Sequence, residues 1–264
     1  MANFFKHFPL VNYKFGDEES TALFQNIGTY ISILDEMKDN IAFHNKHFIG
    51  EYERPDTLSY KLYGTTEFYW TFYYLNPHIR ESGWPISIQE LYTRVKKDYP
   101  NRVVTTNSDI SKILLPGTAV RGTVSSSIGT IVKRNLDMGQ LIIRSEDNFG
   151  PSISEDGTVT ASGEEIIDNT DGAEATSKAT SISETTQYDS IHHYEDSTGE
   201  WQYPTPNTGS SGGIDTSSVS ALWTAITVWN RFENKNNALR EIKILTPNVA
   251  SQVQAEFNKL LKQG

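Results

Sequence analysis

The sequence contains no cysteine among its 264 residues. This absence excludes disulfide frameworks, thiolate zinc sites and cysteine nucleophiles. Long apolar runs are also missing, because no stretch approaches the ~20 residues that span a bilayer. The first nine residues lack the long apolar segment that follows a basic start in a secretory signal. We therefore expect a protein that assembles in the cytoplasm and has no membrane partner.

Dense positive charge is equally scarce. The net charge is −10, and residues 145–200 carry more than the whole imbalance, with 14 acidic residues and one basic residue. Residues 111–144 have an excess of four positive charges, but these do not form a dense patch. The acidic segment would repel a phosphate backbone, so the charge pattern argues against nucleic-acid binding.

The histidines do not form a recognisable metal site. His44 and His47 are three positions apart, and His192 and His193 are adjacent. A zinc site needs three or four ligands, and the sequence has no HExxH pattern. We expect His44 and His47 at ordinary strand or turn positions and His193 in packing or an interface. No metal or cofactor is expected.

Signatures of catalysis are missing as well. The segment 122–129 resembles a glycine-rich phosphate loop, but Thr130-Ile131 stands where Lys and Ser or Thr are required. No GxSxG elbow supplies a serine nucleophile, because the Gly-Ser run 209–213 is typical of a turn. The carboxylates of residues 145–200 lie largely in sequence that we expect to be mobile, whereas glycosidases hold two carboxylates on a rigid frame. We expect a protein that is not an enzyme, with an unrecognised hydrolase as a minor alternative.

Apolar and aromatic residues are plentiful. Hydrophobic residues make up 37% of the chain and aromatic residues 11%, enough for folded cores. Composition and spacing predict an α+β fold in five consecutive segments. These are an N-terminal arm and helix (1–40), an aromatic-rich domain (41–107), an inserted small β domain (108–168), an acidic linker rich in Ser, Thr and Gly (169–215), and a C-terminal helical and strand unit (216–264).

The N-terminal segment combines two patterns. Residues 1–18 read as an extended arm rich in aromatic residues that ends in an acidic turn. In residues 19–40, apolar residues recur at spacings of three and four, which predicts an amphipathic helix. These apolar positions are Leu23, Phe24, Ile27, Ile31 and Leu34.

Residues 54–77 predict two short helices joined by a tight corner. Pro55 suits the first turn of a helix, and Gly64 can end that helix in a left-handed conformation. Thr65 or Thr66 can cap a second helix, which Asn76-Pro77 would stop.

The second helix of this pair is unusually rich in aromatic residues. Six of the seven residues 68–74 are aromatic, and at helical spacing they form three lines around the helix. A short helix on its own domain buries a single stripe about 100° wide. One reading is a self-contained aromatic core. The favoured reading is that another subunit covers the third line of rings, because Tyr and Trp suit such contacts.

Short β-type runs separated by glycine follow in residues 108–168. They predict a small, strongly bent antiparallel sheet or barrel. Residues 169–190 offer little to bury and predict a linker or mobile loop. Arg240–Leu245 alternates as a strand does, and Thr246-Pro247 is typical of a helix start.

Several blocks together resemble a known family. Asp56–Ser59, Leu62–Thr66 and Leu75–Pro77 are similar to the LysM pattern, a βααβ module known chiefly for binding peptidoglycan and chitin. With Tyr69-Trp70 and Gly83-Trp84, the match is closer to the LysM-like baseplate wedge proteins of T-even-type phages. Further blocks similar to that family are Phe5–Tyr13 (as in its cyanophage-like members), His193-Tyr194, Glu200-Trp201 with Pro204, and Asn236–Leu245. Residues 108–168 have no counterpart in the family pattern.

The resemblance implies a structural protein of the virion, located in the baseplate of a contractile tail. Such subunits join wedges into the ring around the hub through contacts with other wedge subunits, neighbouring wedges and possibly the hub. The alternative is a peptidoglycan-binding LysM module, although only one copy is present. Candidate interface residues are Phe4, Phe5, Phe8, Tyr13, Tyr69, Trp70, Tyr73, Trp84, Trp201 and Arg240.

Overall fold

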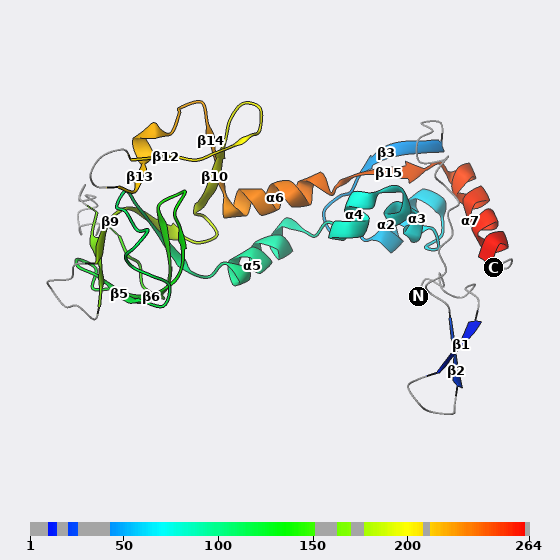
Figure 1. Cartoon of the computed structure of the whole chain (residues 1–264). Helices are drawn as coiled ribbons and strands as arrows, with labels where there is room; N and C mark the ends of the chain where they lie inside the picture. The colour runs from blue at the N-terminus through cyan, green and yellow to red at the C-terminus, as the bar shows by residue number, and fades with distance from the viewer. Residues whose placement is uncertain are drawn as a thin grey trace. The chain divides into compact units, whose positions relative to one another are not determined.

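The chain folds into two compact units, and the sequence of the second unit interrupts that of the first. The structure, a computed structural model, describes residues 10–14, 21–25, 43–150, 163–169, 177–207 and 212–261. Unit 1 comprises residues 1–88 and 235–264, and unit 2 comprises residues 89–234 (Figure 1). This division differs from the expected five consecutive segments, because residues 241–245 return to pair with residues 44–48 of the first unit.

Unit 1 contains two small sheets and a group of short helices. Its first sheet is the hairpin of β1 (Leu10–Lys14) and β2 (Thr21–Gln25). Its second sheet pairs β3 (His44–Phe48) antiparallel with β15 (Glu241–Leu245), and the two strands lie side by side in Figure 1. The helices of the unit are α2 (Pro55–Tyr63), α3 (Tyr69–Leu75), α4 (Pro77–Ser82) and α7 (Pro247–Leu261).

Local sequence signals set the limits of these helices. Pro55 occupies the first position of α2, and Gly64 ends that helix with a left-handed φ of 71°. Asn76 follows α3 and its side chain donates to the carbonyl of Phe72, while Pro77 opens α4 immediately afterwards. Pro247 begins α7 as expected. The expected pair of helices and the C-terminal strand and helix are confirmed.

The helices and the β3–β15 sheet share an apolar core. One buried cluster joins α2, α3, α4, β15 and the residue that follows β3; it consists of Ile49, Leu58, Phe72, Ile79, Ile242 and Ile244. A second cluster joins α3 to α7 and consists of Phe68, Trp70, Leu75, Leu245, Ala250 and Val253. In chain order, β3, α2, α3 and α4 precede unit 2, and the strand that pairs with β3 comes from residues 241–245 rather than from within 41–107.

The predicted helix over residues 19–40 is wrong for its first part. Thr21–Gln25 forms β2, which pairs in register with β1 from Leu10 opposite Gln25 to Lys14 opposite Thr21. Leu23 and Phe24 fit a helical spacing, but pairing with the preceding apolar strand satisfies their backbone groups instead. The rest of the predicted helix, residues 26–40, lies outside the described residues.

Unit 2 is built on a closed antiparallel barrel of six strands. Around the barrel their order is β4-β7-β6-β5-β8-β9. The strands are β4 (Arg102–Thr106), β5 (Ala119–Gly122), β6 (Ile128–Asn135), β7 (Gln140–Arg144), β8 (Glu165–Asp168) and β9 (Lys178–Thr186). Branched apolar residues fill the interior around Val120, Ile131, Leu141 and Ile166. The α+β expectation with a small antiparallel barrel is confirmed at this level.

The barrel extends beyond the bounds predicted for it. Strand β4 precedes residue 108, and β9 lies within the segment 169–190 that was expected to be a linker. The linker prediction fails for β9 because the strand's inward residues are the small Ala179 and Ser181, which give little hydrophobic signal. Residues 170–176 lie outside the described part of the chain.

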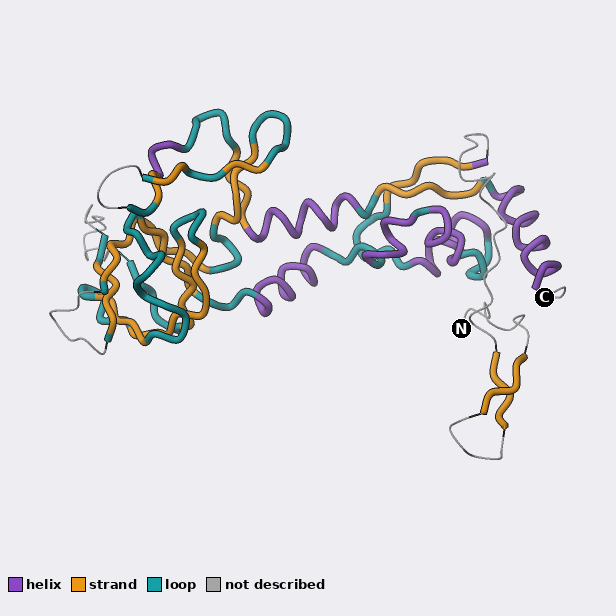
Figure 2. Tube along the Cα trace, in the orientation of Figure 1, coloured by secondary structure: helices purple, strands orange, loops and turns teal. Residues whose placement is uncertain are grey.

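Two helices connect unit 2 to unit 1 along the chain. They are α5 (Ile88–Asp98) and α6 (Val228–Ala238), drawn in purple in Figure 2. Within unit 2, the Tyr92 ring meets the Trp229 ring at 5.4 Å, and Tyr99 meets Phe232 at 5.5 Å. The remaining elements of unit 2 are β10 (Ile191–Glu195), β11 (Trp201–Gln202), β12 (Thr205–Pro206), β13 (Ile214–Asp215), the 3-10 turn Thr216–Ser218 and β14 (Thr224–Thr227).

Candidate interaction surfaces

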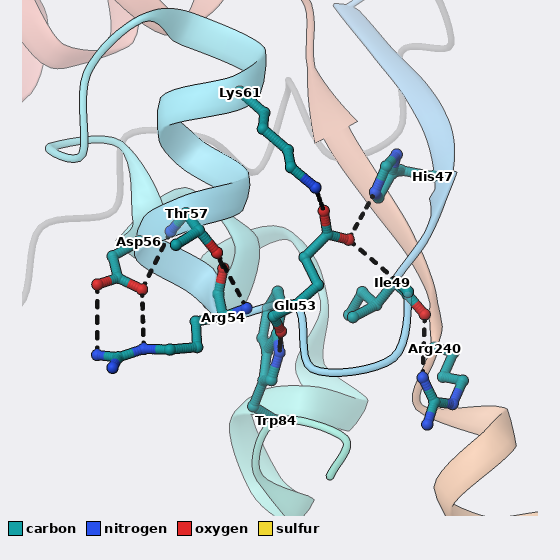
Figure 3. Close-up of polar contacts among 10 residues, drawn as sticks. His47, Ile49, Glu53, Arg54, Asp56, Thr57, Lys61, Trp84 and Arg240 are labelled. Atoms are coloured by element: carbon teal, nitrogen blue, oxygen red, sulfur yellow. Dashed lines mark hydrogen bonds and ion pairs between the residues drawn. The ribbon is translucent and has the colours of Figure 1, made fainter. Parts of the chain in front are cut away.

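The loop between β3 and α2 is held by a nearly buried carboxylate (Figure 3). The Glu53 side chain is 9% exposed, and one of its oxygens lies 2.7 Å from Lys61 Nζ. The other oxygen accepts from the Gly50 backbone N–H at 3.1 Å and lies 3.5 Å from His47 Nε2. Burial raises the pKa of Glu53, but these hydrogen bonds outweigh it and hold the pKa below its usual range. The carboxylate is therefore ionised at neutral pH and fixes the loop.

Two candidate interface residues support the same loop from inside unit 1. Trp84 Nε1 donates to the Glu53 carbonyl at 2.7 Å. Arg240, only 4% exposed, donates to the carbonyls of Ile49 and Ile86 and pairs with Glu51. A buried guanidinium needs such partners, because an unpaired charge there would be costly. Arg240 was expected to contact a partner protein, but its side chain instead bonds to residues of unit 1. Trp84 likewise bonds within unit 1.

The aromatic rings of α3 find their cover within the chain. Phe72 is fully buried in the core with β15, while Trp70 is buried against α7 and donates from Nε1 to Gln254 Oε1 at 3.2 Å. Tyr69 and Tyr73 are partly buried beside the same core. The expectation that another subunit must cover the third line of rings is wrong, because α7 takes that place. The helix spacing alone could not reveal this cover, since α7 begins far away in the sequence.

The β1–β2 hairpin exposes five large apolar or aromatic side chains. Leu10 and Leu23 are each 65% exposed, and Val11 and Phe24 are also exposed. Tyr13 is 54% exposed and meets Phe24 edge to face at 6.4 Å. The candidate residues Phe4, Phe5 and Phe8 lie outside the described residues. Of the predicted arm, the hairpin therefore carries the accessible apolar surface, and Tyr13 stays a candidate interface residue.

A second aromatic cluster surrounds Trp201 in unit 2. The Trp201 ring, 49% exposed, lies 4.2 Å from the buried His193 ring, and the Arg231 guanidinium lies over it at 5.8 Å. His193 Nε2 is 3.0 Å from a carboxylate oxygen of Glu195. Burial, followed by the charge of Arg231, lowers the pKa of His192 beside it. The packing role expected for His193 is confirmed, and Trp201 is half accessible, as an interface residue needs to be.

The described parts of the chain contain no other strong sign of chemistry. No group of three or more His, Asp or Glu side chains within them is placed to hold a metal ion. Their helices are also too short or too polar to cross a membrane. The described residues form a groove of about 450 Å³ beside the start of α4 in unit 1, and a cleft of about 400 Å³ at one end of the barrel in unit 2.

No protein-family model matches the chain, and no curated protein is significantly similar to it.

Proposed function

We propose that this chain is a structural protein of a contractile phage tail, a LysM-like baseplate wedge subunit that joins its neighbours through protein–protein contacts. The observation that carries the proposal is the β1–β2 hairpin with its exposed apolar side chains. Support also comes from the sequence blocks that resemble the wedge family. Among these blocks, Asp56–Ser59 lies in α2, Tyr69-Trp70 opens α3, and Asn236–Leu245 includes β15.

The hairpin is not expected to be stable by itself. A two-stranded sheet is marginally stable in water, because it buries little apolar area. Opposite residues of an antiparallel pair share a face, so Val11, Phe24 and Tyr13 lie together on one face. Leu10 and Leu23 lie on the other face. Covering these side chains with another protein would bury apolar area on both faces and stabilise the hairpin.

The test is incorporation into assembled wedges. The double substitution Leu10→Ser/Leu23→Ser removes two exposed apolar side chains and should leave the fold intact, since exposed positions contribute little to stability. We expect the variant to fold but to be left out of wedges when it is co-expressed with the other wedge proteins. Leu222→Ser, at a position 84% exposed in unit 2, is the matched control. Normal incorporation of the hairpin variant would contradict the proposal.

The alternative function, peptidoglycan binding, has one feature in its favour. The groove beside α4 has a largely apolar floor that includes Leu75, Pro77 and Ile242, with His78 and Lys243 also lining it. A shallow groove with a few polar groups is a common form for small-ligand sites. Retention of the full chain on purified peptidoglycan separates the two functions. Saturable retention that His78→Ala weakens would favour glycan binding, and its absence would favour the wedge role.

A further inference from the structure

The cleft at one end of the barrel combines an apolar floor with two carboxylates. Three separate segments of unit 2 form it: the turn after β4, the turn between β6 and β7, and the chain through β12 and β13. Ile110 and Ile214, both nearly buried, lie in its floor, and the half-exposed Leu136 lines it. Its volume of about 400 Å³ is within the range of ordinary ligand sites.

The walls of this cleft are fixed by close backbone contacts. At Gly213, a Cβ atom would come within 2.1 Å of the Asn107 carbonyl oxygen. At Gly139, it would come within 2.3 Å of the Thr106 carbonyl oxygen and 2.7 Å of Ile214. Only glycine permits these approaches, so the chain through Ile214 is held directly against the turn after β4. The cleft therefore exists before any ligand arrives.

The charge of the cleft is negative. Asp109 and Asp137 line it, and no Lys, Arg or His is among its described lining residues. Hydrogen bonds from the Ser111 hydroxyl and backbone N–H lower the pKa of Asp109, and the nearby positive charge of Lys112 acts in the same direction. Asp109 is thus ionised at neutral pH. A ligand that suits this cleft has an apolar body and a positive charge.

We propose that this cleft binds a lysine or arginine side chain of a partner protein together with an apolar residue next to it. The long aliphatic stem of a basic residue covers apolar surface while its head pairs with a carboxylate. Asp109 and Asp137 receive the positive head, and Ile110, Leu136 and Ile214 receive the stem and the apolar neighbour. The inference rests on the proposed function, because it takes the ligand to be part of a neighbouring subunit.

The experiment is a nuclear magnetic resonance titration of the full chain with acetyl-Lys-Leu-amide and acetyl-Arg-Leu-amide. We expect saturable shifts of the amide signals of residues 108–111, 136–139 and 213–214. The neutral acetyl-norleucine-Leu-amide should bind at least tenfold more weakly. Asp109→Asn/Asp137→Asn should weaken binding of the basic peptides at least tenfold, whereas the exposed Asp147→Asn, outside the cleft, should leave it unchanged.

Three results would overturn the inference: no saturable shift, equal binding of the neutral peptide to the unaltered protein, or calcium chloride saturating the same signals and displacing the peptides. The comparison of basic and neutral peptides uses the unaltered protein, so it does not depend on whether the variants fold. If the protein does not bind the peptides but its incorporation into wedges still requires Leu10 and Leu23, only this inference is refuted. Peptide binding by a chain that never joins wedges would remove the proposed function alone.

Discussion

Glu53 is a carboxylate that is shielded from solvent and yet remains ionised in the folded protein. Its pKa is lowered by the hydrogen bonds from Lys61, Gly50 and His47, in spite of its burial. An unfolded glutamate has a pKa of ~4.3. The folded state therefore gains stability from Glu53 above that pH, and loses this contribution as the pH falls through the lowered pKa.

Replacement of Glu53 should reveal this dependence. We expect Glu53→Gln to destabilise the protein by about 1–3 kcal/mol at pH 7, because it weakens charge-assisted hydrogen bonds at a nearly buried site. The loss should shrink as the pH approaches 3. Urea unfolding between pH 3 and 7 measures both effects. Glu81→Gln, at an exposed position of α4, should change stability little at any pH, and an equal effect at both sites would contradict the argument.

Gly64 gives a second prediction for a single residue. Its φ of 71° lies in the left-handed region, and an added Cβ would meet no atom within 4 Å. Gly64→Ala should therefore cost about 1–2 kcal/mol from backbone strain alone. Gly50→Ala is the matched control, since its Cβ would make an ordinary contact of 3.8 Å with Glu53. Urea unfolding that shows equal costs at both glycines would refute the conformational explanation.

The short helix α3 depends on packing against an element that is distant in the sequence. Its Trp70 is buried against α7 and bonded to Gln254. We expect Trp70→Ala to reduce the free energy of unfolding by about 3–5 kcal/mol, as for other buried aromatic side chains. Tyr60→Ala, at an exposed position of α2, should change it by less than about 0.5 kcal/mol. Thermal unfolding followed by circular dichroism tests the pair, and a silent Trp70→Ala would mean that α7 does not cover α3.

The elements differ in how far the sequence could predict them. Pro55, Gly64 and Pro247 set helix limits by local backbone chemistry, so these limits were predictable. Strand β2 was not, because the helical spacing of Leu23 and Phe24 competes with pairing to a strand that precedes it. Strand β9 was missed for a different reason: a barrel interior can accept small residues such as Ala179, and binary hydrophobicity does not detect them.

The candidate site shows the same division. Tyr13 and Trp201 were expected in interfaces on composition and resemblance, and the structure leaves both accessible. Trp70 and Arg240 were expected there too, but they are buried by residues far away along the chain. The acidic cleft of unit 2 was not foreseen, because Asp109, Asp137 and Ile214 come from three segments that only the barrel topology brings together.

At the scale of the whole molecule, the chain leaves unit 1 and re-enters it at two points that are adjacent in space. The Ile86 backbone N–H donates to Asn236 Oδ1 at 3.0 Å, and Asn236 Nδ2 donates to the Ile86 carbonyl at 2.9 Å. Inserted domains are tolerated when their ends lie close together. Unit 1 also holds its own apolar core on both sides of the insertion.

Unit 1 should accordingly fold without unit 2. We expect a chain in which a short Gly-Ser linker replaces residues 89–234 to be helical and to unfold cooperatively in urea. Asn236→Ala in this shortened chain should destabilise it, because it removes both hydrogen bonds to Ile86 and takes away the acceptor of the Ile86 backbone N–H, while Arg240 still donates to the Ile86 carbonyl. A shortened chain that lacks cooperative unfolding would show that unit 1 depends on unit 2.

The late arrival of β15 governs the order in which a newly made chain can mature. Lys46 of β3 pairs with Glu241 of β15, 195 positions later. On the ribosome, β3 cannot pair until residues 241–245 have emerged, whereas the barrel can close earlier because all of its strands precede β15 in the sequence. A chain truncated just after residue 234 would thus contain the complete barrel, but the apolar faces of helices α2, α3 and α4 would lack the cover of β15 and α7. Such truncated products would depend on chaperones.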